Sequence, residues 1–302
     1  MKNLLLFLSK QGWMKSAVTG FPLSRTMASR FVAGDTIDDV IRVTRLLNSK
    51  GKSVTADHLG EHVTDVAEVK AAHAQYLKLI ERLYAEKLDA NVSVKLSEMG
   101  QDVDEGLCLE NITSLVEHAS KRDMLVRIDM ESSAYTERTM NTFVDLRKKH
   151  ENVGIVLQAY LYRTADDIKR TLELKGRIRL CKGAYAEPPT VAYPDKADVD
   201  RNFAELAGKL VTSGIFHGIA THDEAMVEAT IAHVKKAGLK PEAFEFQMLF
   251  GVRRDLQDKL VKDGWKLRIY VPYGDNWYPY MMRRMAERPA NLLFVVKSMF
   301  KG

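Results

Sequence analysis

Short runs of apolar and β-branched residues alternate along the chain with longer stretches in which apolar residues recur at helical spacing. A short apolar run between turn residues predicts a buried strand, and the longer pattern predicts an amphipathic helix. From residue 53 onwards a strand and a helix follow each other eight times. The predicted strands lie in residues 53–61, 91–100, 124–133, 153–162, 177–185, 217–224, 244–251 and 266–274. The predicted helices lie in residues 65–87, 109–122, 136–150, 165–174, 198–214, 225–239, 253–264 and 279–288.

Eight strand-then-helix units in succession predict an α/β fold, a closed parallel (β/α)8 TIM-like barrel with helices around it. An open doubly wound sheet alternates in the same way. It usually carries a glycine-rich turn after an early strand, however, and no G-x-G-x-x-G stands in that position. We therefore predict the barrel.

The residues before the first predicted strand have helical periodicity, in 4–18 and 36–51, on either side of the turn-rich segment 30–36. We expect these residues to form an N-terminal helical extension that covers the barrel. The predicted division is a helical cover at residues 1–50 and a barrel catalytic domain at residues 51–302.

The composition is that of an ordinary globular protein, with 46% hydrophobic and 28% charged residues. The net charge of +5 is mild and basic residues alternate with acids, so nucleic acid is not an expected partner. Cys108 and Cys181 fit two free thiols in a reducing compartment. Lys10 and Lys15 interrupt the first apolar run, which favours an amphipathic helix over a signal peptide. We expect a cytoplasmic location, with loose peripheral attachment to a membrane surface as the alternative.

Polar and charged residues stand at the end of every predicted strand. In a barrel of parallel strands the active site lies at the carboxyl ends of the strands, so these residues are expected to form one ring. Some of them are also explained as strand-end caps or core hydrogen bonds. In chain order they are Asp57, His58, Glu61, Lys95, Asp129, Glu131, Gln158, Arg179, Lys182, Thr221, His222, Asp223, Gln247 and Tyr270.

Three cations of this ring, Lys95, Arg179 and Lys182, lie within or directly after apolar strands. A cation in such surroundings requires an acidic partner or an anionic ligand. The pattern therefore predicts a barrel enzyme that acts on a small anion.

The last predicted helix carries an unusual stripe, because Tyr280, Arg283, Arg284 and Glu287 lie at positions i, i+3, i+4 and i+7. This spacing normally belongs to an apolar face. The stripe is either a solvated face or the wall of a site that needs two guanidinium groups, which bind a planar carboxylate or phosphate through two parallel hydrogen bonds.

Other kinds of chemistry have less support. The histidines are scattered, and His58 and His62 straddle a strand end, so we expect no metal site. A Schiff-base aldolase or lyase acting on a small carboxylate is the main alternative, because Lys95 or Lys182 inside a barrel suits that chemistry. A non-catalytic anion-binding protein is a third possibility, although binding one anion does not require the whole ring.

The residues at these strand ends resemble those of the proline dehydrogenases, most closely the short monofunctional bacterial type. The resemblance covers most of the chain, and the N-terminal 25 residues are covered least. The matching segments are 30–36, 55–61, 91–100, 127–132, 179–185, 221–224, 244–251 and 270–291.

The resemblance implies a distorted barrel that holds FAD at the carboxyl ends of its strands without a Rossmann fold. It implies oxidation of L-proline to Δ1-pyrroline-5-carboxylate, with hydride transfer from the ring C5 to flavin N5 and reoxidation by a quinone. The sequence ends at Gly302, without the aldehyde dehydrogenase part of the bifunctional relatives. A separate pyrroline-5-carboxylate dehydrogenase is therefore the expected next enzyme.

On the substrate side, the resemblance implies that Arg283 and Arg284 bind the proline carboxylate together with Lys95. The wall against the ring would consist of Tyr270, Tyr280 and Leu249, and Tyr280 would disfavour a ring hydroxyl. Asp129 resembles the family's catalytic acid and is expected to position Lys95. Glu61 resembles an acid that pairs with the first arginine and gates the empty site.

On the flavin side, Arg179 resembles a residue hydrogen-bonded near N5, whose charge stabilises reduced anionic flavin. We group it with Asp129 as catalytic. The resemblance implies that backbone groups at Met130, Gly183 and Ala184 hold FAD. Side chains implied to do so are Gln158, Lys182, Thr221, His222 and Glu287.

Overall fold

The computed structural model describes the backbone of residues 28–287, with side chains up to residue 282. Eight strands close into one barrel, in which each strand is parallel to both neighbours and the order follows the sequence. This confirms the predicted (β/α)8 TIM-like fold. The strands are Ser53–His58 (β1), Ala90–Val94 (β2), Val126–Ile128 (β3), Val153–Gln158 (β4), Arg177–Cys181 (β5), Gly218–Ala220 (β6), Glu245–Leu249 (β7) and Leu267–Tyr273 (β8).

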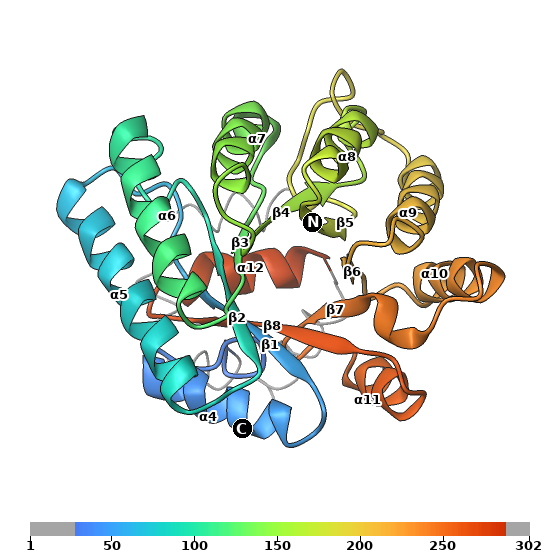
Figure 1. Cartoon of the computed structure of the whole chain (residues 1–302), viewed down its shortest axis with the longest axis horizontal. Coiled ribbons are helices and arrows are strands. Elements are labelled where there is room, and N and C mark those ends of the chain that lie inside the picture. The colour runs from blue at the N-terminus through green and yellow to red at the C-terminus, as the bar shows by residue number, and fades with distance from the viewer. Residues whose placement is uncertain (1–27, 288–302) are drawn as a thin grey trace, which may run out of the picture.

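Helices follow the strands as predicted and surround the barrel (Figure 1). Their inner faces and the outward faces of the strands form one large apolar core. No helix in the described part of the chain is both long enough and apolar enough to cross a membrane. The helices that follow β1 to β7 are Val66–Ala85 (α5), Glu105–Ser120 (α6), Ser133–Arg147 (α7), Thr164–Glu173 (α8), Lys196–Val211 (α9), Glu224–Lys236 (α10) and Arg254–Lys262 (α11).

The outer ring is completed by a helix that precedes the barrel. Helix α4, Ile37–Asn48, packs against β1, β8 and α5 (Figure 1). A capping box starts it, because the Thr36 hydroxyl accepts from the Asp39 amide while the Asp39 carboxylate accepts from the Thr36 amide. Helix α4 thus covers the barrel from the side. The other predicted N-terminal helix, residues 4–18, lies outside the described residues.

The helix after β8 has a different place. Helix α12, Trp277–Glu287, lies inside the ring of outer helices in the view of Figure 1, and Pro279 and Tyr280 face a cavity at the strand ends. The pattern of eight equal units predicts an outer helix here. In this structure α4 fills the remaining outer position, and α12 covers the barrel mouth.

The interior of the barrel is unusually polar. Alternate residues of a strand point inwards, and those of this barrel include Thr55, Asn91, Arg127, Glu245 and Arg268. Barrel interiors are more often filled by branched apolar side chains. The polar groups bond to one another, for example Thr55 to Asn91, so hydrogen bonds hold the barrel from inside.

Candidate active site

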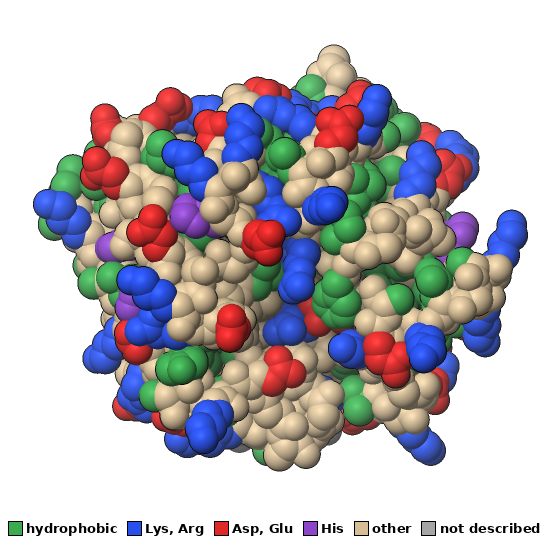
Figure 2. All heavy atoms as spheres, viewed as in Figure 1, with side chains coloured by type: hydrophobic (Ala, Val, Ile, Leu, Met, Phe, Trp, Pro, Cys, Tyr) green, Lys and Arg blue, Asp and Glu red, His purple; other side chains and the backbone are tan. Residues whose placement is uncertain are grey.

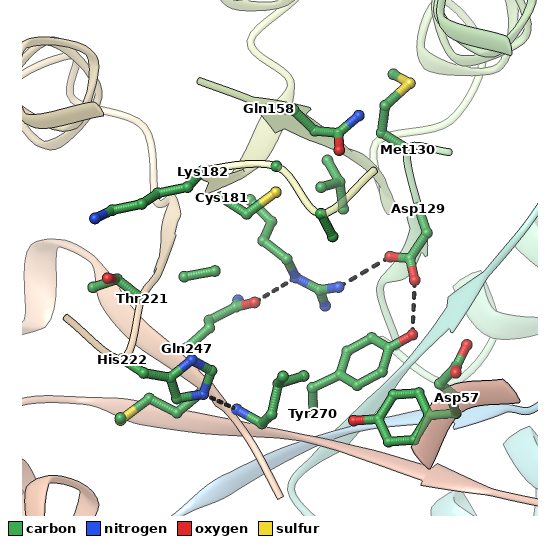
Figure 3. A pocket seen from close by; sticks show the side chains of 18 of the residues that line it. Asp57, Asp129, Met130, Gln158, Cys181, Lys182, Thr221, His222, Gln247 and Tyr270 are labelled. Carbon is green, nitrogen blue, oxygen red and sulfur yellow. Dashed lines mark hydrogen bonds and ion pairs between the residues drawn. The ribbon is translucent and has the colours of Figure 1, made fainter. Parts of the chain in front are cut away.

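A cavity of about 700 Å³ opens at the carboxyl ends of the strands. All eight strands contribute to its lining, either with a strand residue or with the residue directly after the strand (Figure 3). The contributions from β1 to β8 include, in order, Asp57, Lys95, Asp129, Gln158, Arg179, Ala220, Gln247 and Tyr270.

Asp129 lies at the centre of a partly buried hydrogen-bonded cluster. Its Oδ1 accepts from Arg179 Nη1 at 3.0 Å and from Ser93 Oγ at 2.5 Å, and its Oδ2 accepts from the Tyr270 hydroxyl at 2.8 Å (Figure 3). The Arg179 guanidinium carbon also lies 5.1 Å from the centre of the Tyr270 ring. Burial, with the nearby Asp129 charge, raises the pKa of Tyr270 well above its usual value. Tyr270 therefore remains a protonated donor.

Lys95 has a different partner from the one expected. Its Nζ donates to Asp57 Oδ1 at 2.8 Å, and Asp129 is not its hydrogen-bond partner, so the prediction that Asp129 positions Lys95 is wrong. The two acids are easily exchanged in a reading of the sequence, because both lie at the carboxyl ends of apolar stretches. Burial opposes the charge of Lys95, but Asp57, Asp129 and Glu98 raise its pKa above the usual value. Lys95 is therefore a cation.

Lys182 is held by two carboxylates. Its Nζ pairs with Asp200 on α9 and with Asp223, which caps α10, the second at 2.7 Å. Figure 3 shows its side chain extending away from the Asp129 cluster. Lys182 thus joins the β5 end of the cavity to two outer helices.

At the neighbouring end of β6, backbone amide groups hold two side chains in place. His222 Nε2 accepts from the Leu249 amide at 2.8 Å, and Thr221 Oγ1 accepts from the Asp223 amide at 3.1 Å (Figure 3). Because Nε2 is the acceptor, it carries no proton in this arrangement. These contacts tie the ends of β6 and β7 together along the cavity.

Most of the predicted site residues face this one cavity. The side chains of Arg283, Arg284 and Glu287 lie outside the described residues, so their predicted roles stay predictions. The predicted residues that line the cavity are Glu61, Lys95, Asp129, Met130, Gln158, Arg179, Lys182, Gly183, Ala184, Thr221, His222, Leu249, Tyr270 and Tyr280.

Two residues of the predicted ring, His58 and Glu131, do not line the cavity, and several lining residues were not predicted. His58 Nδ1 is instead hydrogen-bonded to Glu98 Oε1 at 2.6 Å. The Glu131 carboxylate accepts from the Ser97 hydroxyl at 2.7 Å and is buried beside β2, so its role is structural. Two of the missed residues had a usable signal, because Cys181 and Met248 belong to the predicted strands 177–185 and 244–251. The lining residues missed from the sequence include Cys181, Met248, Arg253, Asn276 and Pro279.

The face of the molecule shown in Figure 2 carries charges of both signs. On the face shown in Figure 2, lysines and arginines are interspersed with aspartates and glutamates. A nucleic-acid partner would favour a basic patch or stripe. This face therefore lacks that feature.

A family model described as Proline dehydrogenase matches residues 40–297. The chain belongs to the proline dehydrogenase family. It is similar to Proline dehydrogenase 2 of Bacillus subtilis strain 168, with 41% identity over 300 residues that cover 99% of each chain. It is also similar to Proline dehydrogenase of Deinococcus radiodurans, with 41% identity over 281 residues that cover 91% of each.

A solved structure supports the same assignment. The chain is similar to proline utilization A (PutA) from Bdellovibrio bacteriovorus inactivated by N-propargylglycine, with a TM-score of 0.83 and 25% identity. The match covers 91% of this chain and 34% of that one. Membership of the proline dehydrogenase family makes the chain an oxidoreductase, and its likeness to the short relatives confirms the predicted monofunctional type.

Proposed function

We propose that this chain is an FAD-dependent L-proline dehydrogenase that oxidises L-proline to Δ1-pyrroline-5-carboxylate. The observation that carries the proposal is the partly buried cluster of Asp129, Arg179 and Tyr270 in the cavity of a chain from this family. The cluster fixes the Arg179 cation and the Tyr270 ring side by side at the carboxyl ends of the strands.

The cavity fits FAD in size and in chemistry. Its volume of about 700 Å³ lies within the range of small-molecule and cofactor sites. Arg179 lines the cavity, and among the described residues its Nη2 makes one long hydrogen bond, 3.4 Å to Thr55, so the side chain keeps unused donor capacity. The residues that would hold FAD are Arg179, Gln158, Lys182, Thr221 and His222, with backbone groups at Met130, Gly183 and Ala184. When bound, FAD would supply the acceptor for the hydride from the ring C5.

The substrate would bind between cations and rings. Lys95 is charged and faces the cavity, as do the half-buried Tyr270 and the buried Tyr280. In the proposal, Lys95 binds the proline carboxylate together with Arg283 and Arg284. A carboxylate held in this way orients the ring, and orientation contributes a large part of the rate acceleration in such reactions.

The Schiff-base alternative is not favoured. A lysine nucleophile must be an uncharged amine. Lys95 is held as a cation by its ion pair with Asp57, and Lys182 is bound to both Asp200 and Asp223. Neither lysine is prepared for carbinolamine chemistry.

The remaining steps of the proposal concern partners. Reduced flavin would pass its electrons to a quinone, which places the enzyme at least transiently at a membrane surface. The product would go to a separate pyrroline-5-carboxylate dehydrogenase. Copurification with membranes that contain quinone would support the first of these partners.

An anaerobic absorbance titration tests the function. The purified protein supplied with FAD is expected to show bound-flavin bands that bleach when L-proline is added. A protein that binds no flavin, or a bound flavin that ignores L-proline, would contradict the proposal. Borohydride trapping of a carbonyl substrate on a lysine would instead support the aldolase.

Arg284→Met is the matched variant for the proposed clamp. It should retain the flavin bands but require much more L-proline for the same bleaching, because one guanidinium group of the proposed carboxylate site is lost. An unchanged titration would remove Arg284 from the site while leaving the flavin assignment intact.

A further inference from the structure

Gln247 joins a buried cation to a buried anion inside the barrel. Its Oε1 accepts from Arg179 Nε at 2.5 Å, and its Nε2 donates to Glu245 Oε1 at 2.6 Å. Arg179, Gln247 and Glu245 are each at most 6% exposed. Arg179 has a role in the proposed function, whereas Gln247 and Glu245 have none there.

The two neighbours determine which way the Gln247 amide faces. Arginine can only donate, and an ionised carboxylate can only accept. The amide must therefore turn its oxygen to Arg179 and its nitrogen to Glu245, because the reverse orientation would set donor against donor at Arg179 and acceptor against acceptor at Glu245. The network thus selects a single amide orientation.

The rest of the barrel interior is built around this arrangement. Arg268 Nε donates to the same Glu245 oxygen at 2.8 Å, which anchors the carboxylate from below. Across the β6–β7 pair, a Cβ at Gly218 would lie 2.3 Å from Gln247 Nε2, so only glycine leaves room for the amide.

Gln247 restricts the guanidinium of Arg179 to one plane. Nε is held by Gln247, and Nη1 is held by Asp129 and Ser93. Among the described residues, the Nη2 edge makes one long contact, 3.4 Å to the fully buried Thr55. Without the Gln247 acceptor, the side chain could rotate about its last bonds and move this edge.

We propose that Gln247, oriented by Glu245, is a positioning residue that fixes the orientation of the Arg179 guanidinium beside the cavity. Its consequence for the bound flavin rests on the proposed function. A fixed positive charge at that place favours the reduced anionic flavin over the oxidised form. The contacts by which Gln247 holds Arg179 do not depend on a bound flavin.

The geometric part is tested without flavin, by NMR of protein labelled with 15N-arginine. The Nε–H resonance of Arg179, assigned by its absence in Arg179→Lys, should exchange slowly with water. Gln247→Met should lose this resonance or exchange about tenfold faster, as expected for the loss of one buried hydrogen bond. Unchanged exchange in Gln247→Met would overturn the proposal.

Gln257→Met is the matched control. Gln257 is equally buried, but its amide donates to the Leu249 and Val252 carbonyls and does not contact Arg179. It should leave the Arg179 resonance unchanged. Should Gln247→Met fail to fold, the exchanged pair Glu245→Gln with Gln247→Glu preserves an acceptor for Arg179 and a donor behind it. Slow exchange in that variant supports the proposal, and its loss overturns it.

The reduction potential of the flavin-loaded protein tests the consequence. Gln247→Met should shift it to a more negative value, in the same direction as Arg179→Met but by less, and Gln257→Met should not shift it. A normal potential together with a lost Nε–H resonance would overturn the role of Gln247 towards flavin. A protein that binds no flavin would contradict the proposed function, and the NMR experiment would still decide the positioning role.

Discussion

Both carboxylate oxygens of Asp129 have hydrogen-bond donors. Oδ1 is shared by Arg179 and Ser93, and Oδ2 is taken by Tyr270. These donors hold the carboxylate in one orientation. At the residue scale, Asp129 is therefore best understood as a fixed acceptor that orients Arg179 and Tyr270.

The buried ion pair of Lys95 and Asp57 gives a prediction about the stability of the fold. Asp57 is 1% exposed, and its Oδ2 has no hydrogen-bond partner among the described residues. Asp57→Asn leaves the Lys95 cation buried without its counter-charge. It should lower the free energy of unfolding by about 3 kcal/mol, the usual cost of removing one partner of a buried pair. Urea unfolding of the two proteins measures this difference.

The double variant separates charge from packing. Asp57→Asn with Lys95→Met removes both charges, so it should recover part of the lost stability, because exchanging a whole buried pair for neutral groups is often tolerated. If the double variant is as unstable as the sum of both single variants, the ion pair has no measurable coupling.

At the scale of elements, α4 and α12 have exchanged the places that simple alternation predicts. Helix α4 comes before the first strand yet stands in the outer ring beside β8, and α12 comes after the last strand yet covers the cavity. Helical periodicity reports one apolar face and not which neighbour that face meets. In the sequence, the stripe of Tyr280, Arg283 and Arg284 was the only indication that α12 covers the cavity.

The capping box of α4 provides a prediction for this element. Thr36→Ala removes the hydroxyl that accepts from the Asp39 amide, and should lower the free energy of unfolding by about 1 kcal/mol. Flavin binding should be unaffected, because Thr36 does not line the cavity. Thr36→Ser keeps the hydroxyl and is the control in the same denaturation experiment. A loss as large in the serine variant would mean that the methyl group matters, and not the cap.

Strand boundaries were harder to predict than strand positions. The predicted strands 124–133 and 217–224 contain β3 and β6, which are only 3 residues each. Asp129 and Thr221 directly follow these strands and turn towards the cavity. Apolar runs indicate where a strand passes through the core, and the hydrogen bonds that end it depend on neighbouring strands.

For the whole molecule, the order of elements follows from periodicity because every strand and helix has an apolar face that must be buried. The location of the site follows from the fold, because parallel strands bring their carboxyl ends together. The pairing inside the site does not follow. Whether Lys95 meets Asp57 or Asp129, and whether Gln247 meets Arg179, depends on the register and diameter of the closed barrel, which no local pattern contains.

Ligand binding should act on the barrel as a unit, because all eight strand ends line one cavity. FAD at about a hundred times its dissociation constant should raise the free energy of unfolding by about 2.7 kcal/mol, in a single transition. Urea unfolding with and without FAD measures this effect. Riboflavin, which lacks the pyrophosphate, is the control and should stabilise less at equal concentration. A separate transition that FAD leaves unchanged would show that part of the barrel does not respond to the ligand.

The position of α4 also has a consequence during synthesis. Its apolar side chains, among them Ile37, Val40 and Ile41, are buried against β1 and β8. When the ribosome has produced α4 and β1, β8 does not yet exist, and nearly all of the barrel must be translated before it emerges. Nascent chains therefore carry an uncovered apolar segment for most of translation, and such transiently exposed apolar surface is prone to aggregate.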